Sequence, residues 1–259
     1  MPWKGIDQST RNNPIMYDEI SSLYHLVYAD WDASVRRQAS QLSDVIRSEW
    51  GEGLKSILDV TCGIGTQAIG LAALGFSVTA SDISRQAVTR AELEATRRKL
   101  QIGVSVCDIR AAHAHHGSGF ELVISCDNSI PHLLSDDEIR LALEQMHQCA
   151  KSGGGCLVTL RDYDVEARGK GLLKPYGVRE WLGRRYVVFQ IWDFTDANQY
   201  DLSMYFIEDA DEPKAHVGRS RYYAVSPNRV MELMCDVGFN SVRRLDDVFY
   251  QPVLVGTKA

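Results

Sequence analysis

Residues 56–67, which read Ser-Ile-Leu-Asp-Val-Thr-Cys-Gly-Ile-Gly-Thr-Gln, constrain the fold more than any other stretch of this chain. An apolar run with an acidic residue leads into a Gly-x-Gly turn and then a helical pattern. Glycines at 63 and 65 accept positive φ and let a ligand approach the backbone closely. The unpaired N–H groups of the following helix point toward that ligand. The stretch predicts a strand–turn–helix unit that binds a nucleotide-like cofactor.

Strand-like and helical segments alternate after this unit, which predicts a parallel sheet with helices on both faces. A polar stretch, 108–119, is expected to be a loop, and the glycine run at 151–155 is expected to be a turn. The expected strands are 56–60, 76–80, 102–106, 120–125 and 156–160, and the expected helices between them are 66–74, 84–98 and 135–150.

Three regions are expected from these patterns: an N-terminal helical lid (1–53), a cofactor-binding core (54–160 and 226–259) and an inserted antiparallel segment (161–225) that covers the substrate. Apolar and aromatic residues recur at helical spacing from 17 to 31, and a second helix is expected over 33–50. The aromatic stripe either packs on the core or forms a lid over a ligand. The remaining expected strands are 185–194, 199–207, 216–225, 241–248 and 249–257, with a helix over 226–237.

Composition excludes several classes of function. The net charge of −6 argues against a nucleic-acid partner held by bulk electrostatics. The six cysteines include no Cys-x-x-Cys pair and are expected to be reduced thiols. No segment has the ~18 apolar residues of a membrane span, and Met1–Asn13 lacks the apolar core of a signal peptide. We therefore expect a cytoplasmic protein.

Three acidic residues follow the first three strands and decide between cofactors. Asp59 would repel a pyrophosphate but attract an ammonium group, which argues against a nicotinamide dinucleotide. Asp82 is placed to accept both hydroxyls of a ribose, and Asp108 could accept from the amino group of adenine. Open α/β sheets bind ligands at the carboxyl ends of their strands. An amine, a ribose and an adenine without phosphate describe S-adenosylmethionine.

The run Ile57–Thr66 resembles motif I of the class I S-adenosylmethionine-dependent methyltransferases, and Asp82 and Asp108-Ile109 match the ribose and adenine positions of that family. The resemblance implies an α/β, Rossmann-like, seven-stranded and mostly parallel sheet whose last strand is antiparallel. It implies S-adenosylmethionine as cofactor and S-adenosylhomocysteine as product. The implied cofactor-binding residues are Tyr24, Trp31, Arg36, Asp59, Thr61, Cys62, Gly63, Gly65, Thr66, Gln67, Asp82, Ile83, Asp108, Ile109, Cys126, Asn128 and His132.

The segment Cys126-Asp127-Asn128-Ser129-Ile130-Pro131-His132-Leu133 is similar to the C-x-G-N-S-x-x-H-L segment of glycine N-methyltransferases and their glycine/sarcosine relatives. Two further runs, 161–164 and 219–223, resemble other segments of that group. Asp127 departs from the pattern, and the expected lid arginine is out of register, so either Arg36 or Arg37 takes its place. The resemblance implies Asn128, Arg161 and Tyr222 as catalytic residues, and Asn128, Arg161, Arg219 and Tyr222 as substrate-binding residues. Asp127 is a further catalytic candidate because it is the acid nearest the expected methyl position, and Tyr17 and Tyr28 are expected to bind the substrate if the aromatic stripe forms a lid.

The expected activity is methylation of a small molecule, at a nitrogen of an amino acid or amine. Methylation of an oxygen or carbon of a natural product, and cofactor binding without methyl transfer, are the alternatives. His113, His115 and His116 have no cysteine or acidic partner at suitable local spacing, so no metal site is expected. Aromatic N-terminal helices in this family sometimes contact neighbouring subunits, so the resemblance is compatible with a homo-oligomer.

Overall fold

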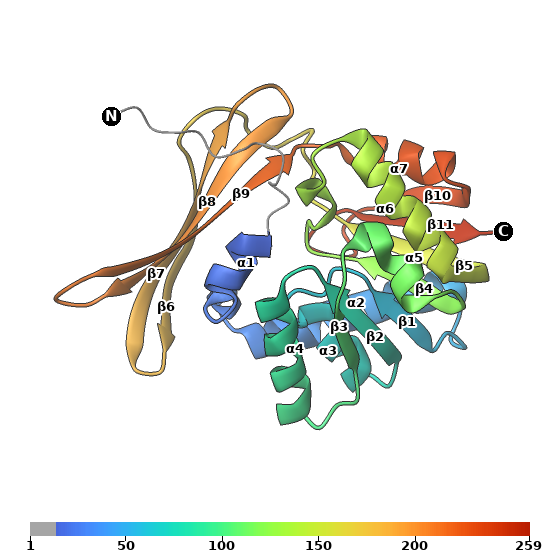
Figure 1. Ribbon diagram of the computed structural model, residues 1–259, viewed down its shortest axis with the longest axis horizontal. Helices are drawn as coiled ribbons and strands as arrows, with labels where there is room; N and C mark the ends of the chain where they lie inside the picture. Colours follow the sequence, from blue (N-terminus) through green and yellow to red (C-terminus); the bar gives the residue numbers. More distant parts are fainter. Residues whose placement is uncertain (1–13) are drawn as a thin grey trace.

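The computed structural model describes residues 14–259, so the first 13 residues of the expected lid lie outside the described part. The described chain forms a seven-stranded sheet and a separate four-stranded sheet. Helix α1 (Pro14–Ile20) lies between the four-stranded sheet and the core that surrounds the seven-stranded one (Figure 1). Within residues 14–259, no helix combines the length and the apolar character that a membrane crossing requires.

The seven-stranded sheet confirms the predicted Rossmann-like core. Its strand order is β10-β11-β5-β4-β1-β2-β3. The neighbours from β5 to β3 pair in parallel, whereas β11 pairs antiparallel with both β5 and β10. The strands are β1 (Ser56–Asp59), β2 (Ser77–Asp82), β3 (Gly103–Val106), β4 (Phe120–Ser125), β5 (Ala150–Thr159), β10 (Phe239–Leu245) and β11 (Val253–Lys258).

Helices cover both faces of this sheet, because successive residues of a strand point to opposite faces. Ile57 packs in the cluster formed with helices α2 and α3, whereas Leu58 packs in the cluster formed with α6 and α7. Four of the helices begin at a side-chain cap, as Ser84 does by accepting from the N–H of Ala87. The helices are α2 (Trp31–Trp50), α3 (Thr66–Ala73), α4 (Arg85–Arg97), α5 (Ala112–His116), α6 (Asp136–Cys149) and α7 (Pro227–Asp236).

The inserted segment forms the four-stranded antiparallel sheet, in the order β6-β7-β8-β9. Its strands are β6 (Leu172–Trp181), β7 (Arg184–Phe194), β8 (Gln199–Asp209) and β9 (Lys214–Tyr223), of which β6 was not expected from the sequence. One face of this four-stranded sheet packs on α1. A Cβ atom added to Gly218 of β9 would lie 2.9 Å from Met16, so a glycine permits this close approach. The inserted sheet therefore holds α1 against the core.

Three local expectations were wrong. The aromatic stripe does not form one helix: α1 ends at Ile20, a 3₁₀ turn follows at Tyr24–Val27, and Asp30 caps α2. The stretch 108–119 contains a 3₁₀ turn (Ile109–Ala111) and the short helix α5. The glycines at 153–155 belong to β5, where the ring of Trp50 lies against Gly155 and leaves no room for a Cβ atom.

Candidate active site

The two glycines of the turn after β1 have different roles. Gly63 has φ of 53°, and the position of its missing Cβ atom is open space, so a ligand can approach there. Gly65 has φ of 92°, and a Cβ atom would lie 2.8 Å from Ile69 of α3. Gly63 thus opens the backbone to the pocket, whereas Gly65 permits close packing at the start of α3.

A pocket lies above this turn, at the carboxyl ends of the parallel strands. Fourteen of its lining residues were predicted from the sequence: Tyr17, Tyr24, Thr61, Cys62, Gly63, Thr66, Gln67, Asp82, Ile83, Asp108, Ile109, Cys126, Asp127 and His132. Seven were not: Val60, Ile64, Cys107, Arg110, Ser129, Ile130 and Leu133. The fold therefore gathers the segments that follow β1, β2, β3 and β4, together with Tyr17 and Tyr24, around one cavity.

Asp82 holds the turn as well as lining the pocket. Its Oδ2 accepts from the N–H of Gly63 at 2.9 Å, and its Oδ1 accepts from the N–H of Ser84 at 2.9 Å. Burial raises the pKa of Asp82, and the two backbone donors oppose that rise. Each carboxylate oxygen has a second lone pair. Asp82 can therefore accept hydrogen bonds from a ligand without releasing the backbone.

Asp108 forms a forked ion pair with Arg110, which the sequence analysis did not select. Arg110 Nε lies 3.0 Å from Asp108 Oδ1, and Nη2 lies 2.5 Å from Oδ2. Burial raises the pKa of Asp108, but the bonds from Arg110 outweigh burial and lower it overall. Arg110 also bonds to Glu138 of α6. The pair fixes the side chain of Asp108 at the edge of the pocket.

Asp59 lies beneath the pocket and is not part of its lining. The residue is fully buried, and its Oδ1 accepts from the N–H of Thr61, while Oδ2 has no partner among the described residues. Burial raises the pKa of Asp59 to about 7. An orphaned buried acceptor is costly unless a ligand or a cation satisfies it. Together with the open space at Gly63, it fits a cofactor that carries an ammonium group.

His132 connects the core, the lid and the inserted sheet. Its Nε2 lies 3.1 Å from the hydroxyl of Tyr17, and its Nδ1 lies 3.1 Å from Ser220 Oγ of β9. The ring of Tyr222 lies against His132, with the centroids 4.1 Å apart. Burial lowers the pKa of His132 to about 4, so the imidazole is neutral at physiological pH. His132 thus links α1 to the core and to the inserted sheet.

Asp127 lines the pocket and is bonded to two tyrosines from distant parts of the chain. Its backbone is in the left-handed region, with φ of 56°, and φ of the next residue, Asn128, is 64°. The Tyr28 hydroxyl donates to Asp127 Oδ2 at 2.8 Å, and the Tyr250 hydroxyl donates to Oδ1 at 2.5 Å. Strained backbone of this kind persists where its surroundings determine it and is common at functional sites. Tyr250 was not predicted, because it is 123 residues from Asp127 and only the fold brings them together.

Asn128 braces the wall of the pocket and does not line it. Its side-chain nitrogen donates to the Tyr163 hydroxyl at 2.9 Å, and its side-chain oxygen accepts from the N–H of Arg161 at 3.0 Å. The guanidinium of Arg161 lies 5.1 Å from the centre of the Trp192 ring in the inserted sheet. Asn128 therefore fixes the start of the chain segment that carries Arg161.

Several predicted site residues do not reach the pocket. Trp31 packs in a cluster with α3 and donates to Thr66 Oγ1 at 2.9 Å, so it anchors α2. Arg36 and Arg37 are exposed on α2 and line no part of the cavity. Tyr222 lies on the buried face of β9. Side chains alternate between the two faces of a strand, so Arg219, three residues earlier, lies on the exposed face. Tyr28, Gly65 and Tyr222 lie next to lining residues but are not themselves part of the lining, and Arg161 is not part of it either.

Comparison with known sequences agrees with this geometry. A family model described as a methyltransferase domain matches residues 57–154. The glycine/sarcosine N-methyltransferase of Parasynechococcus marenigrum (strain WH8102) is 27% identical over 234 residues, which are 84% of this chain and 73% of that protein. The glycine N-methyltransferase of Rattus norvegicus is 29% identical over 157 residues, 56% of this chain, and the alignment spans only 53% of the rat protein.

Solved structures share the whole fold at lower identity. DesVI of Streptomyces venezuelae superposes with a TM-score of 0.77 at 19% identity, over 99% of this chain and 100% of that one. CalS10 of Micromonospora echinaspora, an amino pentose methyltransferase solved with S-adenosylmethionine, has a TM-score of 0.76 at 14% identity, with both chains fully covered. The sequence motifs, the fold and these comparisons agree: residues 57–154 form a methyltransferase domain, and the chain has the fold of the class I S-adenosylmethionine-dependent methyltransferases.

Proposed function

We propose that this enzyme methylates a nitrogen atom of a small amino acid or amine. The observation that carries the proposal is Asp127, which lines the pocket while two tyrosine hydroxyls donate to its carboxylate oxygens. A fixed oxygen acceptor at this position binds an N–H group and orients the nitrogen lone pair away from the carboxyl group. A relative at 27% identity bears the name glycine/sarcosine N-methyltransferase, which also supports an amine acceptor.

In this proposal the strand-end acids hold the cofactor. Asp82 accepts hydrogen bonds from the ribose hydroxyls, and Asp108 accepts one from the amino group of adenine. Asp59 supplies negative charge near the cofactor's ammonium group. S-adenosylmethionine, when bound, supplies a methyl group on a positively charged sulfur, which is already electrophilic. The protein therefore has to hold the acceptor in line with that methyl group and exclude water.

The lid residues serve the acceptor in this proposal. Tyr17 and Tyr24 line the pocket and shield it from solvent, and neutral His132 keeps Tyr17 in position. An amine becomes nucleophilic only after it loses its proton, and burial among apolar rings favours the neutral form. Asp127 then accepts a hydrogen bond from the remaining N–H group. The pocket selects an acceptor through orientation and dehydration, without a covalent intermediate on the protein.

Arg161 extends the proposal to acceptors that carry a carboxylate. Its side chain is only 28% exposed and lies between Trp192 and Glu166, where Nη1 is 4.0 Å from Glu166 Oε1. An arginine in such a place suits forked binding of a carboxylate. We propose that the carboxylate of the acceptor binds here while its amino group binds at Asp127.

An acceptor screen with methyl-labelled S-adenosylmethionine tests the proposal. The panel should contain glycine, sarcosine and larger amino acids, matched amines without a carboxylate, amino sugars, and phenols. We expect transfer to amines, with amino acids preferred over their decarboxylated partners. Transfer only to phenols or carbon acids would instead support O- or C-methylation. Tight binding of S-adenosylhomocysteine with no transfer to any acceptor would support a regulatory protein.

A further inference from the structure

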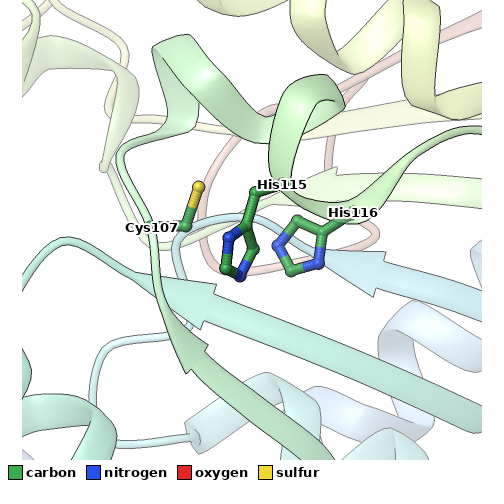
Figure 2. A group of neighbouring side chains, drawn as sticks. All are labelled: Cys107, His115 and His116. Atoms are coloured by element: carbon green, nitrogen blue, oxygen red, sulfur yellow. The ribbon is translucent and has the colours of Figure 1, made fainter.

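A group of three side chains that could together hold a metal ion lies beside the cofactor pocket. Cys107 follows β3 directly, and His115 and His116 are the last two residues of α5 (Figure 2). One ligand atom from each residue lies within 4.8 Å of the other two. The sequence gives no sign of this, because Cys107 is eight residues from His115 and only the turn through α5 brings them together. These three side chains are called the Cys107 cluster below.

Two serines orient the histidines of the cluster. His116 Nε2 lies 2.9 Å from Ser81 Oγ, and His115 Nε2 lies 2.9 Å from Ser105 Oγ. Ser81 and Ser105 are opposite each other in the pairing of β2 with β3, so both rings are held over the same edge of the sheet. In metal sites, a hydrogen bond of this kind to a ligating histidine fixes the orientation of its ring.

The donor set selects the kind of ion. One thiol and two imidazoles suit a late first-row divalent ion, whereas magnesium and calcium require oxygen donors. Asp108, the acid nearest in sequence, is engaged in its ion pair with Arg110. Three protein ligands leave a fourth tetrahedral position for water.

Small side-chain movements bring the three atoms into coordination range. Donors bound to one tetrahedral ion at about 2.0–2.3 Å lie roughly 3.3–3.7 Å from one another. The donors of the cluster must therefore approach one another by about 1 Å. His115 is exposed and His116 is only partly buried, so both side chains can shift by this distance without disturbing the core. Cys107 is buried and supplies the fixed ligand.

We propose that Cys107, His115 and His116 form a binding site for a divalent transition metal ion of the zinc type. The thiol gives up its proton when it coordinates the ion. The bound ion ties α5 to the carboxyl ends of β2 and β3, and methyl transfer does not require it. A ligand that binds only the folded state raises the melting temperature, so zinc should stabilise this protein.

Cobalt titration of the full-length reduced protein, freed of any affinity tag, tests this site. We expect one equivalent of Co²⁺ to give tetrahedral absorption bands and a thiolate-to-cobalt charge-transfer band, which Zn²⁺ then abolishes. Cys107→Ser should remove the charge-transfer band, and His116→Ala should weaken binding at least tenfold. His115→Ala, at an exposed position, serves as the second imidazole variant if His116→Ala fails to fold.

Two matched variants control for other thiols and histidines. Cys235→Ser removes an exposed thiol on α7, and His113→Ala removes an imidazole of α5 that is not in the cluster. Both should bind Co²⁺ as the unchanged protein does. The proposal is overturned if the unchanged protein shows no tetrahedral bands, if the charge-transfer band survives in Cys107→Ser, or if a control variant loses binding equally.

Discussion

The hydroxyl of Tyr250 donates a 2.5 Å hydrogen bond to Oδ1 of Asp127, and so joins the loop between β10 and β11 to the residue that borders the pocket. Tyr28 of the lid bonds to the other oxygen of the same carboxyl group. Asp127 is therefore held from two sides by segments at opposite ends of the chain. We assign to this arrangement the orientation of the acceptor nitrogen.

Tyr250→Phe tests this assignment, because it removes the hydroxyl and keeps the ring that lies against Phe249. We expect kcat to fall about tenfold, the effect of losing one hydrogen bond to a charged group. The Kd for S-adenosylhomocysteine should change less than twofold. Tyr205→Phe, on the opposite face of the inserted sheet from the lid, is the matched control and should leave both values unchanged. A normal kcat in Tyr250→Phe would remove Tyr250 from the site.

Asp82→Ala removes the acceptor proposed for the ribose hydroxyls and the cap of the Gly63 N–H group. We expect binding of S-adenosylhomocysteine to weaken by roughly 1–3 kcal/mol, measured by calorimetry. Asp44→Ala, at an exposed position on α2, controls for loss of one negative charge. Equal affinities in the two variants would mean that Asp82 does not contact the ribose.

Arg161→Ala should raise KM for an amino-acid acceptor at least tenfold, because the acceptor's carboxylate loses its partner. The affinity for S-adenosylhomocysteine should not change, and Arg161→Lys should recover part of the loss. Steady-state kinetics with a matched amine that has no carboxylate provides the control, since its KM should not respond. A parallel loss of cofactor affinity would instead show that Arg161 supports the pocket wall through Asn128.

The buried Asp59 makes stability depend on pH. Its pKa is about 7 in the folded protein and about 3.9 when unfolded, so the folded state binds the extra proton. The contribution is complete below pH 4 and is lost as pH rises through 7. Asp59→Asn cannot lose a proton at this position. In urea unfolding, its free energy of unfolding relative to that of the unchanged protein should therefore increase as the pH is raised from 5 to 8. A constant difference across this range would show that Asp59 does not titrate there.

Gly155→Ala tests the packing of Trp50 against β5, the strand that contains the glycine run expected to be a turn. A Cβ atom at this position would overlap the rigid ring of Trp50, and overpacking of this kind costs about 1–3 kcal/mol or more. Gly103→Ala in β3 meets nothing within 4 Å and is the control. If urea unfolding gives both variants the same stability, Trp50 is not held against the sheet as described.

The sequence predicts the core of the fold because local signals dominate there. The strand–turn–helix unit at Gly63, the helix expected over 84–98 and the acids at strand ends are local patterns with direct structural causes. Strand β6 was missed because its apolar alternation is interrupted by Pro175 and Gly177. The glycine run was read as a turn, since no local signal reveals that Trp50 of a distant helix covers it.

The candidate site was predicted less completely, because some of its members meet only through the fold. Tyr250 and Arg110 belong to no recognisable motif. Each bonds to an acidic residue that the sequence analysis did select: Asp127 for Tyr250 and Asp108 for Arg110. Arg219 was assigned by resemblance, but the two-residue period of a strand places it on the other face from Tyr222. The register of a strand relative to the pocket therefore decides which motif residues reach it.

The position of the transferred methyl group tests the central claim most directly. The enzyme is incubated with ¹³C-methyl S-adenosylmethionine and the best acceptor, and the product is assigned by NMR and mass spectrometry. We predict a single new carbon–nitrogen bond on the amino group of the acceptor, and a much slower reaction in Asp127→Asn. A product labelled on oxygen or carbon, formed at the normal rate by Asp127→Asn, would contradict the account.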